Sequence, residues 1–246
     1  MKDSLSRIDV GISEITDILL THHHIDHVGL LYNIKKNVDC SFSKSYRLLT
    51  RPDIILTDGD KISTENYSFK IILTPGHSPG HICLYETNFK FLIAGDHILP
   101  KITPNIIPYK EDSNPLYDYF ESLDKIDDYD VKKVLPGHQN VFTGCHRRIQ
   151  ELRDHHLDRC NEILQIIWEE ELNAYQIASL LHWNVDCTSW NQFDPFQKWM
   201  AIGETISHLK FLESERFIDR VEKDEKIFYL AKLRNISSLR INRQRS

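Results

Sequence analysis

Short apolar runs separated by polar turns dominate the first 145 residues of the chain. Tyr67–Leu73 alternates between apolar and polar positions and then becomes fully apolar, which is typical of a half-buried strand. The same reasoning predicts strands over four further runs: Ile18–Leu20, His81–Tyr85, Phe89–Ala94 and Val131–Leu135. Most of these runs end at a turn signal, and Asp58-Gly59-Asp60 predicts a further turn.

Helical patterns lie between the predicted strands. A short helix is predicted over Val28–Lys36. A second begins at Asn114-Pro115, with Asn as the N-cap and Pro at the first helical position. Its apolar face consists of Leu116, Tyr119, Phe120 and Leu123. Strands and helices mixed in this order predict an α/β layered domain over residues 1–145.

The pattern becomes mostly helical after residue 145. A long amphipathic helix is predicted over His146–Trp168, and Asn173 with Gln176 forms a capping-box pattern before a second helix. A third helix is predicted over Pro195–Leu212, followed by strands at Arg216–Arg220 and Lys226–Leu230. The long helix carries Ile149, Leu152, His156, Cys160, Ile163 and Ile167 on one face. Three helices followed by a hairpin predict a winged-helix domain over residues 146–231, with a basic tail at 232–246.

Four histidines and an aspartate fall within the six positions that follow the first predicted strand. Side chains alternate along an extended chain, so His22, His24 and Asp26 share one side, while His23 points elsewhere. His27 follows where the chain can turn into a helix. Imidazole and carboxylate suit zinc and similar divalent ions, so this cluster predicts a metal site.

Three further ligand candidates lie directly after apolar strands. They are His77 in LTPGHSPGH, Asp96 in FLIAGD and His138 in KVLPGH. Loops at strand ends on a rigid sheet are where functional groups tend to converge. Four other histidines are expected to act otherwise. His81 is expected to support or pack against the site, His97 to support it through hydrogen bonds, and His155 and His156 to lie on a solvated or core face of their helix.

The series HHHIDH, TPGHSPGH, AGD and LPGH resembles the metallo-β-lactamase superfamily. The resemblance implies an αββα sandwich with two metal ions at one edge of its sheets. One ion would be held by His22, His24 and His77, and the other by Asp26, His27 and His138, with Asp96 bridging both. Zinc is usual in that family, and iron or manganese occurs in some branches. Asp26 and Asp96 are the expected catalytic residues, because a metal-bridging hydroxide would attack the substrate and Asp26 would orient it.

Two features indicate the branch of the family. Asp96 stands where the common zinc β-lactamases place a cysteine, and AGDHILPKITPNI departs from thiolesterases of the glyoxalase II type. The later segments HRRIQELRDHH, LNAYQIASLL and AIGETISHLKFL resemble the group that joins this domain to a C-terminal winged helix. Animal members of that group resemble an endoribonuclease that cuts single-stranded RNA.

Only 21 residues precede His22, and they lack the apolar run ending in Asp-Thr-Gly that usually opens the domain. An N-terminally truncated and less stable domain is therefore expected.

Composition and charge limit the kinds of partner and the cellular compartment that the sequence predicts. The 246 residues carry a net charge of −6, and residues 146–231 hold ten Lys and Arg against sixteen Asp and Glu. This acidic balance argues against DNA as a partner. Five widely spaced cysteines without a CxxC pair indicate reduced thiols in the cytoplasm. No apolar run is long enough to span a membrane.

The leading prediction is a metal-dependent hydrolase that acts on an ester, thioester or lactone of a small molecule. The alternative is a phosphodiesterase or endoribonuclease acting on single-stranded RNA, which the five basic residues of the tail favour. A non-enzymatic metal-binding regulator is a third class, and the complete ligand set makes it the weakest. The sequence leaves the substrate and the oligomeric state open.

Overall fold

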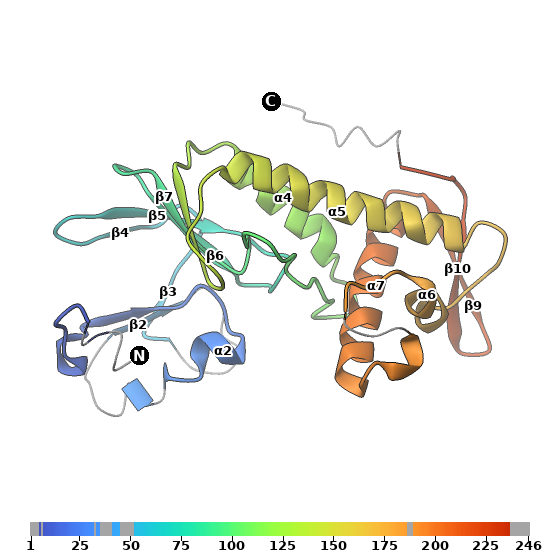
Figure 1. Ribbon diagram of the computed structural model, residues 1–246, viewed down its shortest axis with the longest axis horizontal. Helices are drawn as coiled ribbons and strands as arrows, with labels where there is room; N and C mark the ends of the chain where they lie inside the picture. Colours follow the sequence, from blue (N-terminus) through green and yellow to red (C-terminus); the bar gives the residue numbers. More distant parts are fainter. Residues whose placement is uncertain are drawn as a thin grey trace. The chain divides into compact units, whose positions relative to one another are not determined.

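The computed structural model describes residues 5, 7–31, 33–34, 41–44, 52–185 and 189–236, with the backbone alone at 41–44. These residues form two compact units, each described separately (Figure 1). The first comprises Met1–Pro104 and Asp124–Cys145, and the second comprises Asn105–Leu123 and His146–Ser246. Segment 105–123, which the sequence pattern placed in the first domain, thus belongs to the second unit. Within the described residues, no helix has the length and apolar character needed to cross a membrane.

A small parallel sheet opens the first unit. It consists of β1 (Asp17–Leu19), β2 (Ser41–Lys44) and β3 (Ile54–Ile55), in that order. The 3₁₀ helix η1 (Ile12–Glu14) precedes β1, and the single-turn helix α2 (Ile25–Val28) follows it. Helix α2 overlaps the helix predicted over Val28–Lys36 only at Val28, and a turn at residues 29–30 follows it. Helical residues recur at 31, 33 and 34, and the end of the predicted helix lies outside the described residues.

The larger sheet has five strands in the order β4-β5-β6-β7-β8. Its strands are β4 (Lys61–Ser63), β5 (Ser68–Leu73), β6 (Ile82–Glu86), β7 (Phe91–Gly95) and β8 (Lys133–Pro136). Neighbouring strands are antiparallel except β7 and β8, which are parallel. The four strands predicted from Tyr67 onward are confirmed within two residues at each end. The turn predicted at residues 58–60 is also present, with Gly59 at φ +87°.

An apolar core joins the two sheets of the first unit. Leu56, Ile71, Ile82 and Leu84 are buried together, and Leu19 of β1 packs against them. The core therefore fixes the end of β1 against β5 and β6. Truncating Ile71, which is fully buried, would cost about 2–5 kcal/mol of unfolding free energy. This packing holds the His-rich segment that follows β1 close to the larger sheet.

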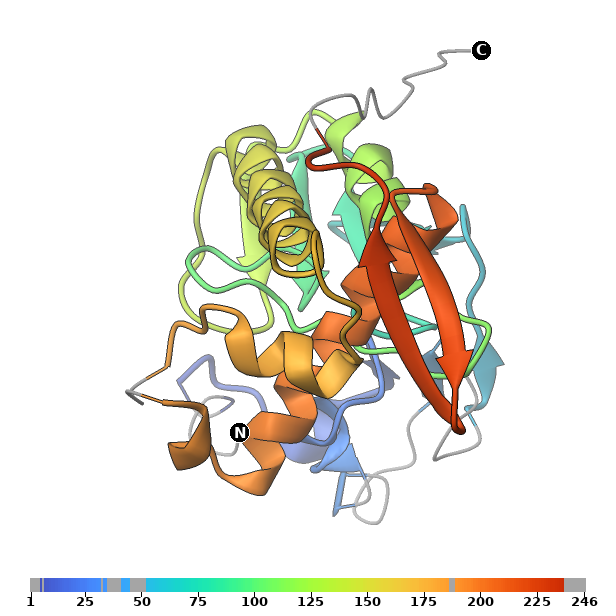
Figure 2. The same cartoon turned by 90° about the vertical axis from the view of Figure 1, so that its right-hand side faces the viewer.

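The second unit contains the predicted helices and hairpin. Helix α5 (Cys145–Ile166) buries five residues of its predicted face, and the sixth, Ile167, is buried directly after the helix ends. Helix α6 (Ala174–Leu180) begins with the predicted capping box of Asn173 and Gln176. Helix α7 (Pro195–Ser214) begins with a second capping box, which Asp194 and Gln197 form. The hairpin of β9 (Ile218–Lys223) and β10 (Lys226–Ala231) lies beside α7 (Figure 2).

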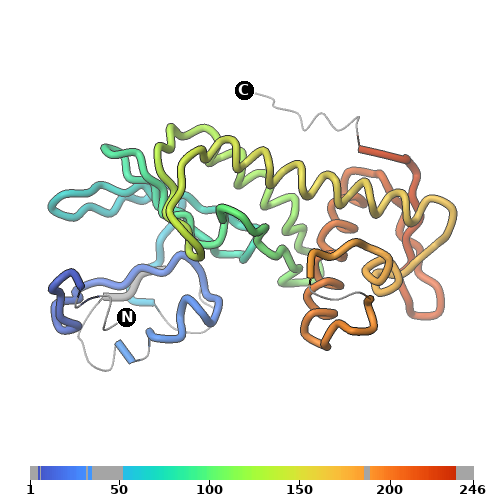
Figure 3. The backbone as a smooth tube through the Cα atoms, in the orientation of Figure 1, coloured from blue at the N-terminus to red at the C-terminus, as the bar shows by residue number. Residues whose placement is uncertain are grey.

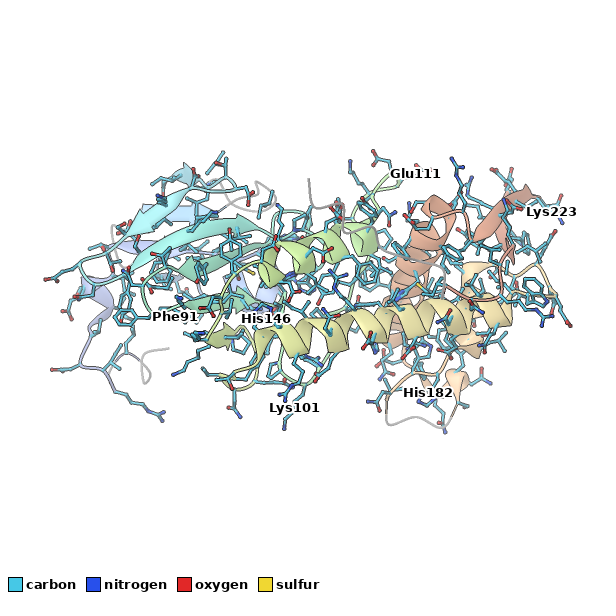
Figure 4. All side chains as sticks on the ribbon, turned by 90° about the horizontal axis from the view of Figure 1, so that it is seen from above. Phe91, Lys101, Glu111, His146, His182 and Lys223 are labelled. Atoms are coloured by element: carbon cyan, nitrogen blue, oxygen red, sulfur yellow. The ribbon has the colours of Figure 1, made fainter. Side chains whose placement is uncertain are left out.

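Several connections complete this unit. The 3₁₀ helix η2 (Trp190–Gln192) precedes α7, and helix α4 (Pro115–Asp127) contributes its first nine residues. The chain between β7 and α4 runs without a helix or strand (Figure 3). Lys223 lies at the turn of the hairpin and pairs with Glu171, so the hairpin is also fastened to the segment before α6 (Figure 4).

A buried polar chain links α5 and α7. His208 Nδ1–H donates to the carbonyl oxygen of Glu204 at 2.8 Å, which leaves His208 Nε2 to accept from His156 Nδ1–H at 3.1 Å. Both imidazoles are fully buried. The Glu204 carboxylate accepts a hydrogen bond from Asn105 Nδ2 at 3.0 Å. Burial lowers the pKa of His208 to about 3 and raises the pKa of Glu204 to about 7, against a weaker opposing effect of Arg159 on Glu204.

Glu204→Gln is expected to stabilise the protein at pH 8 and to leave its stability almost unchanged at pH 5. The folded chain holds the Glu204 proton up to about pH 7, whereas the unfolded chain releases it near 4.5. The stability that this proton contributes is therefore complete below pH 4.5 and is lost as the pH rises through 7. The difference amounts to at most about 3 kcal/mol. His208 has the opposite sign, because its contribution is lost as the pH falls from 6.5 toward 3.

Thermal melts of both proteins at the two pH values measure this difference. Glu213→Gln, an exposed neighbour on the same helix, is the matched control and should change little at either pH. A Glu204→Gln protein that melts below the unaltered protein at pH 8 would contradict the assignment.

Candidate metal centre

The His-rich segment is fastened at both ends. Its start is tied to the larger sheet, because Ile82 N–H of β6 donates to Thr21 O at 2.9 Å. Its end turns into α2, with His24 as the extended N-cap residue (φ −63°, ψ 149°). Between these points the chain is extended, so His22 and His24 lie on one side with ring centroids 4.8 Å apart.

One group of three histidines forms around this pair. His77, in the loop after β5, lies with its ring centroid 4.4 Å from that of His24 and 5.1 Å from that of His22. One nitrogen from each of the three rings lies within 4.8 Å of the others. His22 is fully buried at its side chain and His77 nearly so.

A second group combines two histidines with two carboxylates. His138 Nε2 lies 3.0 Å from Asp26 Oδ2, and His27 Nε2 lies 3.5 Å from the same oxygen. The two Nε2 atoms are 3.3 Å apart. Asp96 completes the group. This side is the open one, because the side chains of Asp26 and His138 are 52% and 43% exposed.

Asp96 faces both groups. Its Oδ2 atom lies 3.3 Å from Nε2 of both His27 and His138, and 3.8 and 3.7 Å from Nε2 of His22 and His77. A single carboxylate oxygen is therefore surrounded by four imidazole nitrogens, two from each group.

The parallel pair of β7 and β8 explains how Asp96 and His138 meet. Parallel strands end at the same edge of a sheet, and each of these residues follows its strand closely. Gly137 N–H donates to Gly95 O at 2.7 Å and joins the two loops. A Cβ atom on Gly137 would overlap Asp96 Oδ1 and come within 2.8 Å of His27 Cε1, so only glycine fits there.

The electrostatics keep donor atoms available in the first group. Burial, reinforced by the neighbouring His77, His27 and His24, lowers the pKa of His22 to about 2, and burial also lowers the pKa of His24. The hydrogen bond with Asp96 raises the pKa of His27. Burial alone would raise the pKa of Asp96, but the hydrogen bond and charge of His27 hold it below its usual value.

The donor set fits divalent metal ions. His22 Nδ1 is engaged with Thr21 Oγ1 at 3.1 Å, whereas its buried Nε2 has no hydrogen-bond partner among the described residues. The same is true of buried Asp96 Oδ1. Buried polar atoms normally have partners, and five imidazoles with two carboxylates match the nitrogen and oxygen ligands of zinc. Iron and manganese are compatible with the same donors.

All seven ligands named from the sequence lie in these two groups: His22, His24, Asp26, His27, His77, Asp96 and His138. The other histidines lie apart from them or serve differently. His23 is half-buried beside His24, and His97 is fully buried beside His81. His81 uses both ring nitrogens in hydrogen bonds to the protein, and His156 lies in the buried chain of the second unit.

Several residues that shape the centre were not singled out by the sequence reasoning. Gly137 and Gly95 belong to motifs that were quoted for the ligand candidates His138 and Asp96, although a glycine directly before a candidate ligand signals close packing. Thr74 and Cys83 carried no signal, because each is an ordinary residue at a strand end or within an apolar strand.

Comparison with known proteins agrees with this picture. The family model described as the metallo-beta-lactamase superfamily matches residues 1–48 and 42–138. The chain is 23% identical to the probable metallo-hydrolase YqjP of Bacillus subtilis, over 93% of this chain and 84% of that one. It is 31% identical to a hydroxyacylglutathione hydrolase of Rhizobium etli (53% and 48% covered) and 35% identical to the acyl-coenzyme A thioesterase MBLAC2 of Gallus gallus (37% and 33% covered).

A solved structure shares the fold. The beta-lactamase domain protein from Burkholderia ambifaria superposes with a TM-score of 0.81, at 23% identity, over 93% of this chain and 77% of that one. The family model covers more than half of the chain and includes every residue of the two groups. The chain therefore belongs to the metallo-beta-lactamase superfamily.

Proposed function

We propose that this protein is a binuclear zinc hydrolase that cleaves the acyl bond of a small thioester. The observation that carries the proposal is the position of Asp96 Oδ2, within 3.8 Å of imidazole nitrogens from both groups. One ion would be held by His22, His24 and His77, and the other by Asp26, His27 and His138. Asp96 would be shared between them.

The chemistry divides between the ions and the side chains. Bound divalent ions would lower the pKa of coordinated water toward neutrality and would polarise the carbonyl oxygen of the thioester. Asp26 would orient the attacking water through the carboxylate oxygen that does not hold the ion. As the C–O bond forms and the C–S bond breaks, the proton of this water would pass to the departing thiolate. Asp96, which is 9% exposed, would hold its negative charge between the two groups throughout.

The exposure of the side chains supports a direction of approach. His22 and His77 close one side of the centre, whereas Asp26 and His138 reach solvent. A substrate would therefore approach over Asp26 and His138. Asp26, which would orient the attacking water, then faces the substrate together with the other residues of the more exposed group.

Two arguments favour a thioester. The names of two relatives, a hydroxyacylglutathione hydrolase and an acyl-coenzyme A thioesterase, specify hydrolysis of acyl thioesters. The acidic balance of residues 146–231 also favours a small molecule over RNA, since phosphate backbones need clustered cations. The helices and hairpin of the second unit support a winged-helix domain, and its acidic balance favours a role other than nucleic-acid binding.

A parallel assay tests the proposal. Zinc-loaded protein should hydrolyse a fluorogenic acyl thioester. His138→Ala should lower kcat/KM by more than about 100-fold, because losing a residue that only supports a metal ligand already costs up to that factor. A lactone and single-stranded RNA are assayed alongside. His182→Ala, an exposed histidine of the second unit, is the control and should retain full activity. Cleavage of RNA alone would replace the proposed function with the phosphodiesterase alternative.

A further inference from the structure

The turn that carries Asp96 is held by a side chain outside the ligand set. Asp96 N–H donates to His81 Nε2 at 3.2 Å, and His81 is fully buried. Gly95, at φ +48°, lies directly against the same ring, since a Cβ atom there would come within 2.6 Å of His81 Nε2. The imidazole thus contacts the turn at two consecutive residues.

The hydrogen bonds fix the tautomer of His81. A backbone N–H can only donate, so His81 Nε2 must accept and the ring proton lies on Nδ1. Nδ1–H then donates to Thr74 Oγ1 at 2.8 Å. Both ring nitrogens are used within the protein, and no lone pair remains for a metal ion.

The hydrogen bonds that begin at Asp96, directly after β7, lead back to Ala94 within β7. The Thr74 hydroxyl has two acceptors, Cys83 Sγ at 3.4 Å and His81 O at 3.5 Å, and the Cys83 thiol donates to Ala94 O at 3.6 Å. Burial raises the pKa of Cys83 to about 12, so the thiol keeps its proton. Thr74, His81, Cys83 and Ala94 are all fully buried.

We propose that His81 is a positioning residue, which sets the place of the Asp96 carboxylate through the closed chain His81–Thr74–Cys83–Ala94. These hydrogen-bonded side chains contact the backbone at Ala94 and at Asp96, on both sides of Gly95, the glycine that allows the turn. Asp96 Oδ2 lies near four imidazole nitrogens, so a small shift of this turn changes four distances at once. This role rests on the proposed function, in which Asp96 is the ligand shared by two metal ions.

Two variants at one position separate the role from simple packing. His81→Phe keeps a ring of similar size and removes the acceptor for Asp96 N–H. His81→Gln places a carbonyl oxygen near the position of Nε2 and restores the acceptor. We expect His81→Phe to bind zinc about 10–100-fold more weakly in competition with a chelator, the range seen when a group supporting a metal ligand is lost. His81→Gln should recover most of that affinity.

The visible spectrum of the cobalt-substituted protein provides a second readout, because it reports ligand geometry. It should change in His81→Phe and return toward the original in His81→Gln. Equal zinc affinity and equal cobalt spectra in His81→Phe and the unaltered protein would overturn the proposal. So would equal losses in both variants, which would indicate packing alone.

A measurement on the unaltered protein covers the case in which His81→Phe does not fold. Long-range proton–nitrogen correlation of ¹⁵N-histidine-labelled protein should show His81 as the Nδ1–H tautomer, and an Nε2–H tautomer would overturn the proposal. Zinc affinity is measured without substrate. Failure to hydrolyse any thioester would therefore contradict the proposed function, while the two variants still decide the role of His81.

Discussion

Asp96→Ala is expected to abolish thioester hydrolysis and to reduce the zinc bound by each chain from two ions to one or none. The substitution removes a buried carboxylate oxygen that lies within 3.8 Å of imidazole nitrogens from both groups. Each group would then keep its own ligands and lose the shared one. The anion that offsets two neighbouring cations would also be lost, and charges of like sign repel strongly at a buried site.

Elemental analysis measures the zinc bound per chain, and kcat/KM on the thioester measures the activity. We expect kcat/KM to fall by at least about 1,000-fold, because the nucleophile would depend on both ions. Asp96→Asn is the matched variant, because it keeps the volume and one oxygen but removes the charge. It should retain more zinc than Asp96→Ala and still lose most activity. An alanine variant that holds two zinc ions and stays within tenfold of full activity would exclude a bridging role.

Gly137→Ala is expected to have the second largest effect. The added methyl group would overlap Asp96 Oδ1 and come within 2.8 Å of His27 Cε1 and 3.1 Å of Gly95 C. The nearest atoms belong to Asp96, His27 and the backbone of Gly95, so making room for the methyl group would displace two of the candidate metal ligands. We therefore expect zinc affinity to fall by about 100-fold or more, beyond the usual cost of losing a supporting contact.

Gly59→Ala is the matched control for this variant. Gly59 has φ +87°, so alanine strains the backbone by about 1–2 kcal/mol, yet no atom lies within 4 Å of the added methyl group. It should lower the melting temperature and leave zinc affinity unchanged. Zinc titration and thermal melts of both variants separate steric intrusion at the centre from backbone strain elsewhere. Unchanged zinc affinity in Gly137→Ala would show that the loop tolerates the displacement.

The ligands could be named from the sequence because each follows a recognisable local signal. His77, Asp96 and His138 lie at turns after apolar strands, and the His22–His27 segment follows β1. Such signals depend only on residues near in sequence. The roles assigned to the seven residues stay predictions, while their common location follows from the two sheets whose strands they follow.

Other features depend on residues far apart in sequence and could not be anticipated. Strands β2 and β3 are short, and β2 reads SFSK, so neither shows a strong pattern. Segment 105–123 joins the second unit through contacts such as Asn105 with Glu204 and Asn114 with Ser214, about one hundred residues away. From the sequence, His81 resembled a sixth candidate histidine, and its two hydrogen bonds within the protein show that both ring nitrogens are occupied.

The backbone bond from Gly137 to Gly95 joins the two loops that bear Asp96 and His138. Because each loop supports the other, the Gly137 amide should exchange with deuterium only when the two loops separate. A chelator that cannot reach the buried Asp96 would have to wait for that event. The lifetime of an ion held by His22, His24 and His77 would then be set by the separation of two strand ends, whereas an ion beside the exposed Asp26 and His138 would stay within reach of the chelator.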